Sequence, residues 1–324
     1  MKICLYGAGA VGGVIGAHIV ASGRELSVVA RGATLDALQR KGLGLEAEGR
    51  RTHYPVRAVA NPAELGPQDL VIVAVKEPAM AAVAAAIAPL IGPGTKVMTA
   101  MNGVPWWFFD GLHGPLEGAA LRSVDPENTL RSKIPSAQII GCVVHIACST
   151  AEPGVSIQKM GNGLIIGEPS GAPSDATRTV AAMLTDAGLD ITVTEHIQRE
   201  IWFKLWGNMT MNPISALTGA TSDRLLDDPL VNAFCVSIME EAASIGEYIG
   251  CPVGQAPAAR NAITRSMGAM KTSMLQDVEA GRRLEIDALL SVVHEIADKA
   301  GIAVPNISAL LGLVRVFAQS RGLR

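Results

Sequence analysis

The stretch that decides the fold is Lys2-Ile3-Cys4-Leu5-Tyr6-Gly7-Ala8-Gly9-Ala10-Val11-Gly12. Residues 2–6 have the apolar character of a short buried strand, and the residues after Gly12 have helical spacing. In such a turn the first glycine permits the tight bend, the second lets the backbone approach a pyrophosphate, and the third lets helix and strand pack closely. The free N–H groups of the helix N-terminus then hold the phosphates. Residues 7–12 therefore predict a dinucleotide site.

Length and composition limit what kind of protein this is. A chain of 324 residues exceeds what one hydrophobic core usually supports, which favours two domains. It is 49% hydrophobic with a mean hydropathy of +0.31. No segment reaches the roughly 18 to 20 uninterrupted apolar residues of a membrane span. Because the glycine turn occupies the place of a cleavable apolar segment, we expect no signal peptide and a cytoplasmic protein.

Charge and cysteine content argue against several kinds of partner. The net charge is −3 and the pI is near 6.1, and no run of Lys and Arg interleaves with aromatic residues. Nucleic acid is therefore not an expected partner, and neither is a membrane. The five cysteines are odd in number and contain no CxxC pair, so the sequence indicates neither a disulfide framework nor a metal site. We expect them to be reduced and mostly buried.

The first half of the chain alternates strand-like and helical segments. Strand-like runs occur at residues 2–6, 25–30, 70–75, 96–100 and 139–145, antiparallel strands are expected within 151–168, and a helix at 174–187 and a strand at 190–194 follow. This pattern predicts an α/β fold, in which a Rossmann-type, doubly wound and mostly parallel sheet fills residues 1–194. Residues 195–324 have helical periodicity and predict an all-helical second domain, with breaks at Pro213, Pro229, Pro252, Pro257 and Pro305.

The end of the second strand indicates which dinucleotide binds. A site for NAD usually has Asp or Glu there, to bind the ribose hydroxyls. Here Arg31 stands in that place, and its guanidinium suits a 2′-phosphate, so NADP(H) is favoured over NAD(H). Lys76 and Asn102 follow two further strands, where side chains face a bound cofactor. The alternatives are a solvated Arg31, a helix-start Lys76 and a simple turn at Asn102.

A polar stripe opens the second domain. Lys204, Asn208 and Asn212 are spaced i, i+4, i+8 on one helix face, among large apolar residues. A lysine in such surroundings loses hydration, and it usually gains a partner or a depressed pKa, either of which suits catalysis. The alternative is a lysine whose ammonium extends to solvent along an amphipathic helix.

Glu285 is a second polar residue expected in an apolar setting. It shares a helical stripe with Leu289, Val292 and Ile296, which predicts that its carboxylate faces the interior. A helix-start acid stabilised by the dipole is the alternative. One interior Lys and one interior Glu on two helices together favour a shared site.

These residues together resemble the ketopantoate reductase (2-dehydropantoate 2-reductase) family over nearly the whole chain. The resemblance rests on residues 7–12, Val75-Lys76, Asn102-Gly103, Trp202-Phe203-Lys204-Leu205 with Asn208 and Asn212-Pro213, Ser273-Met274-Leu275-Gln276-Asp277, and Glu285-Ile286-Asp287. It implies NADPH-dependent reduction of a 2-oxo acid, most simply 2-dehydropantoate to pantoate, in a cleft between a Rossmann domain and a helical domain.

The resemblance also implies a role for each residue. Lys204 would be the general acid to the carbonyl oxygen, and Glu285 would position Lys204, the cofactor ribose or a substrate hydroxyl. Arg31 and Lys76 would serve the cofactor phosphates, and Asn102 would lie between cofactor and substrate. Asn208, Asn212 and Ser273 would bind substrate oxygens.

Two positions depart from the family pattern. The chain has Thr221-Ser222-Asp223-Arg224 where the family often has Asn-Gly-Glu, and it has Met270 where the family often has Asn. A pocket built on hydrogen bonds discriminates strongly between substrates. These changes therefore bear on which substrate binds more than on the type of reaction. The alternatives are a reductase or dehydrogenase of a different 2-oxo or hydroxy acid, and a non-catalytic NADP(H)-binding sensor. The apolar run Leu310-Leu311-Gly312-Leu313-Val314 fits either a homodimer contact or a core.

Overall fold

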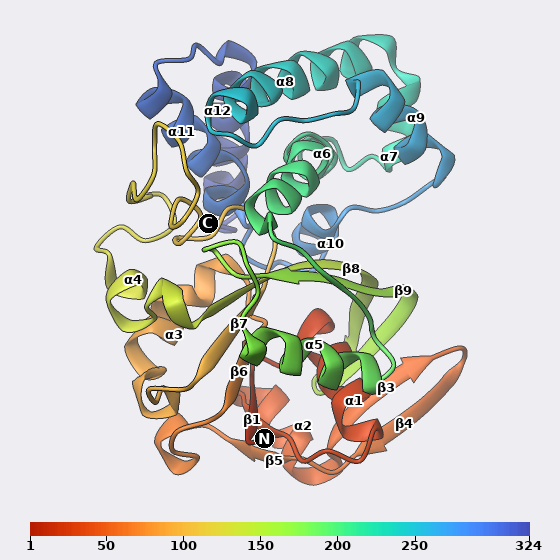
Figure 1. The fold of residues 1–324 in the computed structure, drawn as a ribbon. Helices are drawn as coiled ribbons and strands as arrows, with labels where there is room; N and C mark the ends of the chain where they lie inside the picture. Colours follow the sequence, from red (N-terminus) through yellow and green to blue (C-terminus); the bar gives the residue numbers. More distant parts are fainter. The chain divides into compact units, whose positions relative to one another are not determined.

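The computed structural model describes residues 1–324, which form two compact units (Figure 1). Unit 1 comprises residues 1–101 and 128–197, and unit 2 comprises residues 102–127 and 198–324. The sequence had placed 102–127 in the first domain. Within unit 2 this segment buries a run of aromatic residues, and the Phe108 ring lies 6.1 Å from the Trp202 ring. Burial of these rings explains why the segment belongs to the helical unit.

Unit 1 is a ten-stranded sheet with helices packed on it. Its strands are β1 (Ile3–Tyr6), β2 (Ser27–Val29), β3 (Leu43–Ala47), β4 (Arg50–Tyr54), β5 (Arg57–Val59), β6 (Leu70–Val73), β7 (Lys96–Ala100), β8 (Ile139–Glu152), β9 (Val155–Gly167) and β10 (Asp190–Val193). Their order is β4-β3-β9-β8-β7-β6-β1-β2-β5, with β10 beside β9. Only the β3–β4 and β8–β9 pairs are antiparallel. The mostly parallel, doubly wound sheet is confirmed.

Both faces of the central strands are buried. On β6, Ile72 joins the core formed with α1 (Ala10–Ala21) and α5 (Asp175–Asp186), while Val71 and Val73 are buried on the other side. Burial on both faces explains why these strands are continuous apolar runs. The remaining helices of unit 1 are α2 (Gly32–Lys41), α3 (Met80–Ala86) and α4 (Thr129–Lys133).

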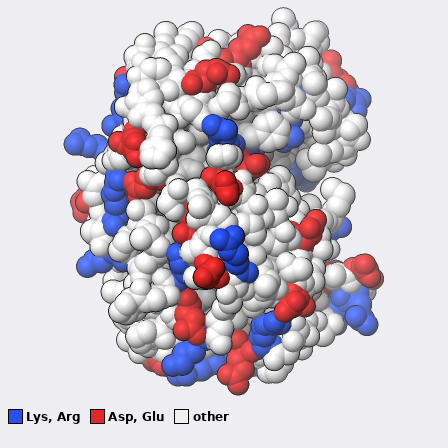
Figure 2. Space-filling model, viewed as in Figure 1, with Lys and Arg blue, Asp and Glu red and all other residues white.

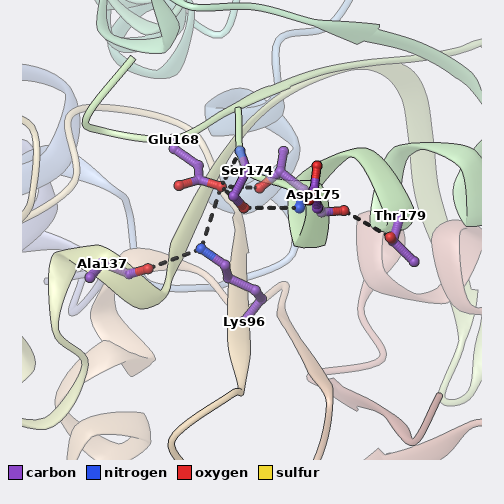
Figure 3. Close-up of polar contacts among 7 residues, drawn as sticks. Lys96, Ala137, Glu168, Ser174, Asp175 and Thr179 are labelled. Atoms are coloured by element: carbon purple, nitrogen blue, oxygen red, sulfur yellow. Dashed lines mark hydrogen bonds and ion pairs between the residues drawn. The ribbon is translucent and has the colours of Figure 1, made fainter. Parts of the chain in front are cut away.

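A buried carboxylate joins β9 to α5 (Figure 3). Glu168, just after β9, accepts hydrogen bonds from the Ser174 N–H, the Ser174 hydroxyl and the Thr177 hydroxyl. Lys96 on β7 places its Nζ 3.4 Å from the same carboxylate and donates to the Ala137 carbonyl at 3.0 Å. The cluster ties the start of α5 to two strands.

Unit 2 is all-helical, as expected. Its helices are α6 (Ile197–Thr218), α7 (Ser222–Asp227), α8 (Pro229–Tyr248), α9 (Pro257–Ser266), α10 (Ser273–Glu279), a π-helical turn (Asp287–Ser291), α11 (Val292–Ala300) and α12 (Pro305–Ser320). Proline occupies the first position of α8, α9 and α12, where no N–H is needed. The break expected at Pro213 was wrong, because α6 continues through it.

Burial and surface charge complete the description. The cysteines are all free, and only Cys148 is partly exposed. Leu310, Leu311 and Val314 lie in the core, whereas Leu313 is exposed. No helix is long and apolar enough to cross a membrane. On the face shown in Figure 2, Lys and Arg side chains are interspersed with Asp and Glu side chains on a largely uncharged surface.

Candidate functional site

The glycine turn lies at the point where the strand order reverses, between β1 and β6. Gly7 has a φ of +99°, and a Cβ there would lie 2.5 Å from Val75 Cγ1. A Cβ on Gly12 would lie 2.1 Å from the Gly7 carbonyl oxygen, so only glycine permits this bend. A Cβ on Gly9, by contrast, would meet nothing within 4 Å. The backbone at Gly9 therefore borders open space, which leaves room for a ligand to approach it.

The start of α1 suits a phosphate group. Gly9 is its N-cap and supplies no side-chain cap, and Ala10 and Val11 lie in its first turn. The first N–H groups of a helix have no partner within the helix, and the dipole favours an anion there. The residues present in this turn therefore fit the pyrophosphate of a dinucleotide.

Two cations flank the turn. The Gly7 N–H donates to the Val29 carbonyl at 3.1 Å, which places the end of β2 beside the turn. Arg31 follows two residues later, exposed, as the N-cap of α2. Lys76 is exposed after β6, next to the Val75 that contacts Gly7. A guanidinium at a helix N-terminus is a suitable site for a ribose phosphate.

Lys204 and Asn102 meet within unit 2. Lys204 is half-buried on α6, and its Nζ donates to Asn102 Oδ1 at 2.8 Å. Asn102 is fixed by its neighbours, since Gly103 (φ +85°) lies against Ala288 and the Val104 N–H donates to the Ala288 carbonyl. The contact joins the strand-end asparagine and the helix lysine that the sequence had singled out separately.

The other polar residues of the stripe follow along α6. Asn208 is half-buried one turn after Lys204, and Asn212 is buried. Asn212 Nδ2 lies 3.4 Å from Ser273 Oγ, at the start of α10, where Ser273 is exposed. Amide and hydroxyl groups in this arrangement are suitable for binding the oxygens of a small polar molecule.

Glu285 is buried, with 7% of its surface exposed. It is not on a helix, however, because the first helical residue is Ile286 and a π-helical turn spans Asp287–Ser291. The i, i+4, i+7 register assumed a regular α-helix from Glu285 onward. The burial expectation agrees with the structure, but the helical position was wrong.

The two positions that depart from the family pattern contact each other. Ser222 is 1% exposed, its N–H donates to the Met270 carbonyl at 3.0 Å, and its hydroxyl lies 3.2 Å from the Gly268 and Met270 carbonyls. Ser222 thus anchors the loop between α9 and α10. Met270 on that loop is 39% exposed.

Arg260, a cationic residue of unit 2, was not singled out from the sequence. Arg260 on α9 lies over the Phe203 ring, with its Cζ 5.6 Å from the ring centroid. The signal was present in the sequence, since residues 248–276 contain Arg260, Arg265 and Lys271 but no Asp or Glu.

Comparison with known proteins gives consistent matches. Residues 3–171 match the family model for ketopantoate reductase PanE/ApbA, and residues 196–318 match the model for its C-terminal part. The 2-dehydropantoate 2-reductase of Mesorhizobium japonicum is 44% identical over 99% of both chains. A crystal structure from Ralstonia solanacearum is 55% identical and has a TM-score of 0.97 over 100% of this chain and 99% of that one. A D-mandelate dehydrogenase solved with NADH and anilino(oxo)acetate has a TM-score of 0.85 at 20% identity, over 99% and 100% of the chains, and shares the fold.

Proposed function

The chain belongs to the ketopantoate reductase family, and we propose that it reduces 2-dehydropantoate to pantoate with NADPH. As a member of this family it is an oxidoreductase acting on a CH–OH group. The observation that carries the proposal is the hydrogen bond between Lys204 and Asn102, which orients an ammonium beside a row of neutral polar side chains.

In the proposed reaction the carbonyl carbon of the substrate would accept a hydride, which is the chemistry that NADPH would supply when bound. Negative charge then develops on the carbonyl oxygen, where the Lys204 ammonium stabilises it and donates a proton. The 2-hydroxy acid is the product, and Lys204 regains its proton from solvent. Asn102 accepts from Nζ and so holds the ammonium in one orientation.

The other residues bind and orient. Asn208, Asn212 and Ser273 offer amide and hydroxyl groups to substrate oxygens. The buried Glu285 would position Lys204, the cofactor ribose or a substrate hydroxyl. In unit 1 the turn at residues 7–12 holds the pyrophosphate, and Arg31 and Lys76 hold the ribose phosphate side. An exposed arginine in the place of the usual acid supports NADPH over NADH.

A second candidate is reduction of a 2-oxo acid with a larger apolar side chain. Met270 favours it, because a partly exposed thioether replaces an amide at a position that the family uses for substrate. The fold-level similarity to a D-mandelate dehydrogenase adds aromatic 2-oxo acids to the compounds that need testing.

The test follows NADPH absorbance with purified protein, 2-dehydropantoate and a panel of branched and aromatic 2-oxo acids, each repeated with NADH. We expect 2-dehydropantoate to have the highest kcat/KM and NADPH to be preferred. Activity on another acid alone would replace the substrate. Cofactor binding without turnover on any acid would contradict the enzymatic proposal and favour a sensor.

A further inference from the structure

Arg260 is held beside the helix that carries the polar stripe. Its guanidinium lies over the Phe203 ring on α6, one residue before Lys204. It also contacts Gly207, where an added Cβ would lie 3.1 Å from Nε and 3.3 Å from Nη2. Glycine at 207 therefore makes room for a guanidinium against the backbone of α6.

This guanidinium has no counter-charge in the protein. Arg260 is half-buried, its Nε is buried without a hydrogen-bond partner, and no ion pair is formed. Burial lowers its pKa. Arg265, five residues further along α9, instead pairs with both carboxylate oxygens of Asp227, at 2.6 and 3.0 Å. Since a desolvated cation without a partner is unfavourable, Arg260 is poised to receive an anion.

The position of Arg260 matches the substrate chemistry. Gly207 is three residues after Lys204, and residues at this spacing lie about 5–6 Å apart on a helix surface. In a 2-oxo acid the carboxylate is bonded to the carbonyl carbon itself. When the carbonyl oxygen contacts Lys204, the substrate carboxylate lies within a few ångströms of the Lys204 ammonium. The carboxylate is then directed towards one of the side chains that neighbour Lys204.

We propose that Arg260 binds the substrate carboxylate and thereby restricts the enzyme to 2-oxo acids, excluding neutral 2-oxo amides. The inference rests on the proposed function and specifies which group of the substrate is recognised by charge. A planar guanidinium offers two parallel N–H donors that match a carboxylate, and the cation–π contact with the Phe203 ring restrains its position.

The test compares kcat/KM for a 2-oxo acid and its primary amide in the wild type and in Arg260→Gln. We expect the substitution to lower kcat/KM for the acid about 10- to 100-fold, mainly through KM, the range for charge-assisted hydrogen bonds. Reduction of the amide should change little, so the preference for the acid is lost. Arg265→Gln, on the same helix but already neutralised by Asp227, is the matched control and should retain the preference.

A second variant guards against loss of folding. Gly207→Ala keeps Arg260 but crowds its guanidinium, and should raise KM for the acid and not for the amide. An equal effect of these substitutions on acid and amide would overturn the inference and leave Arg260 as a packing partner of Phe203. That result is distinct from failure of the proposed function, in which the wild type reduces no 2-oxo acid at all.

Discussion

The Lys204 ammonium donates a hydrogen bond to the Asn102 amide oxygen, and this contact orients Nζ. An ammonium held in this way can stabilise an oxyanion. The sequence identified Lys204 from a helical stripe and Asn102 from a strand end. It could not predict their contact, because a separation of 102 residues is bridged only in the folded chain.

Replacing Lys204 tests its role as the acid. Lys204→Ala should lower kcat about 100-fold or more, the usual effect of losing a general acid. NADPH affinity, measured by fluorescence titration, should be nearly unchanged, because the residues proposed to bind the cofactor phosphates lie in unit 1. Lys271→Ala, which removes an exposed lysine paired with Glu279, is the control. Unchanged turnover together with lost cofactor binding would refute the assignment.

Replacing Arg31 tests the choice of cofactor. Arg31→Ala should raise the Kd for NADPH about 10-fold or more, since a charge-assisted contact with the 2′-phosphate is lost. The Kd for NADH should stay the same. Arg40→Ala on the same helix, where Nε bonds the Asp36 carbonyl, controls for loss of positive charge. Equal weakening of both cofactors would show that Arg31 does not contact the phosphate.

Among the elements, those determined by local sequence were predicted best. The turn after β1 and the strands of the sheet centre follow from glycine spacing and from apolar runs buried on both faces. The hairpin of β3 and β4 was missed, because β4 is an exposed edge strand of polar residues that lacks an apolar signal. The π-helical turn after Glu285 was missed because its register depends on packing, not on periodicity.

Substitutions of two glycines in the first turn should have different effects on stability. Gly12→Ala places a Cβ 2.1 Å from a backbone oxygen and should destabilise the protein by about 1–3 kcal/mol or more in urea unfolding. Gly9→Ala meets no atom within 4 Å, so stability should change by less than about 0.5 kcal/mol. Its methyl group should nevertheless weaken NADPH binding, because the proposed site places the pyrophosphate against Gly9. Full NADPH affinity in a folded Gly9→Ala variant would argue against the site.

The Glu168 cluster predicts a pH dependence of stability (Figure 3). Burial alone would raise the pKa of this carboxyl, but hydrogen bonds from Ser174 and Thr177 and the charge of Lys96 outweigh it and lower the pKa. A lowered pKa in the folded state stabilises the protein above the ordinary value of 4.5, and this contribution is lost as the pH falls through the folded-state pKa.

Urea unfolding from pH 6 to pH 3 measures this contribution. Glu168→Gln should be less stable than the wild type at pH 6, and the difference should shrink as the pH falls. Glu64→Gln, at an exposed carboxylate, is the control. A difference that is constant with pH would show that the charge of Glu168 does not contribute.

At the scale of the whole molecule, the chain passes between the units three times, near residues 101, 127 and 197. Sequence patterns are read along the chain, so they favoured two consecutive segments and assigned residues 102–127 by adjacency. The aromatic residues 106–109 instead complete the core of unit 2, a long-range preference that no local pattern reveals. Asn102 contacts Lys204 because residues 102–127 belong to the helical unit.

The central claim is hydride transfer to a 2-oxo acid, and isotope labelling tests it most directly. The purified enzyme is incubated with 2-dehydropantoate and NADPH deuterated at the transferable C4 position, and the product is analysed by mass spectrometry and NMR. We predict pantoate with one deuterium on C2 for each NADPH oxidised. Recovery of unchanged 2-dehydropantoate, or of pantoate without deuterium, would contradict the account.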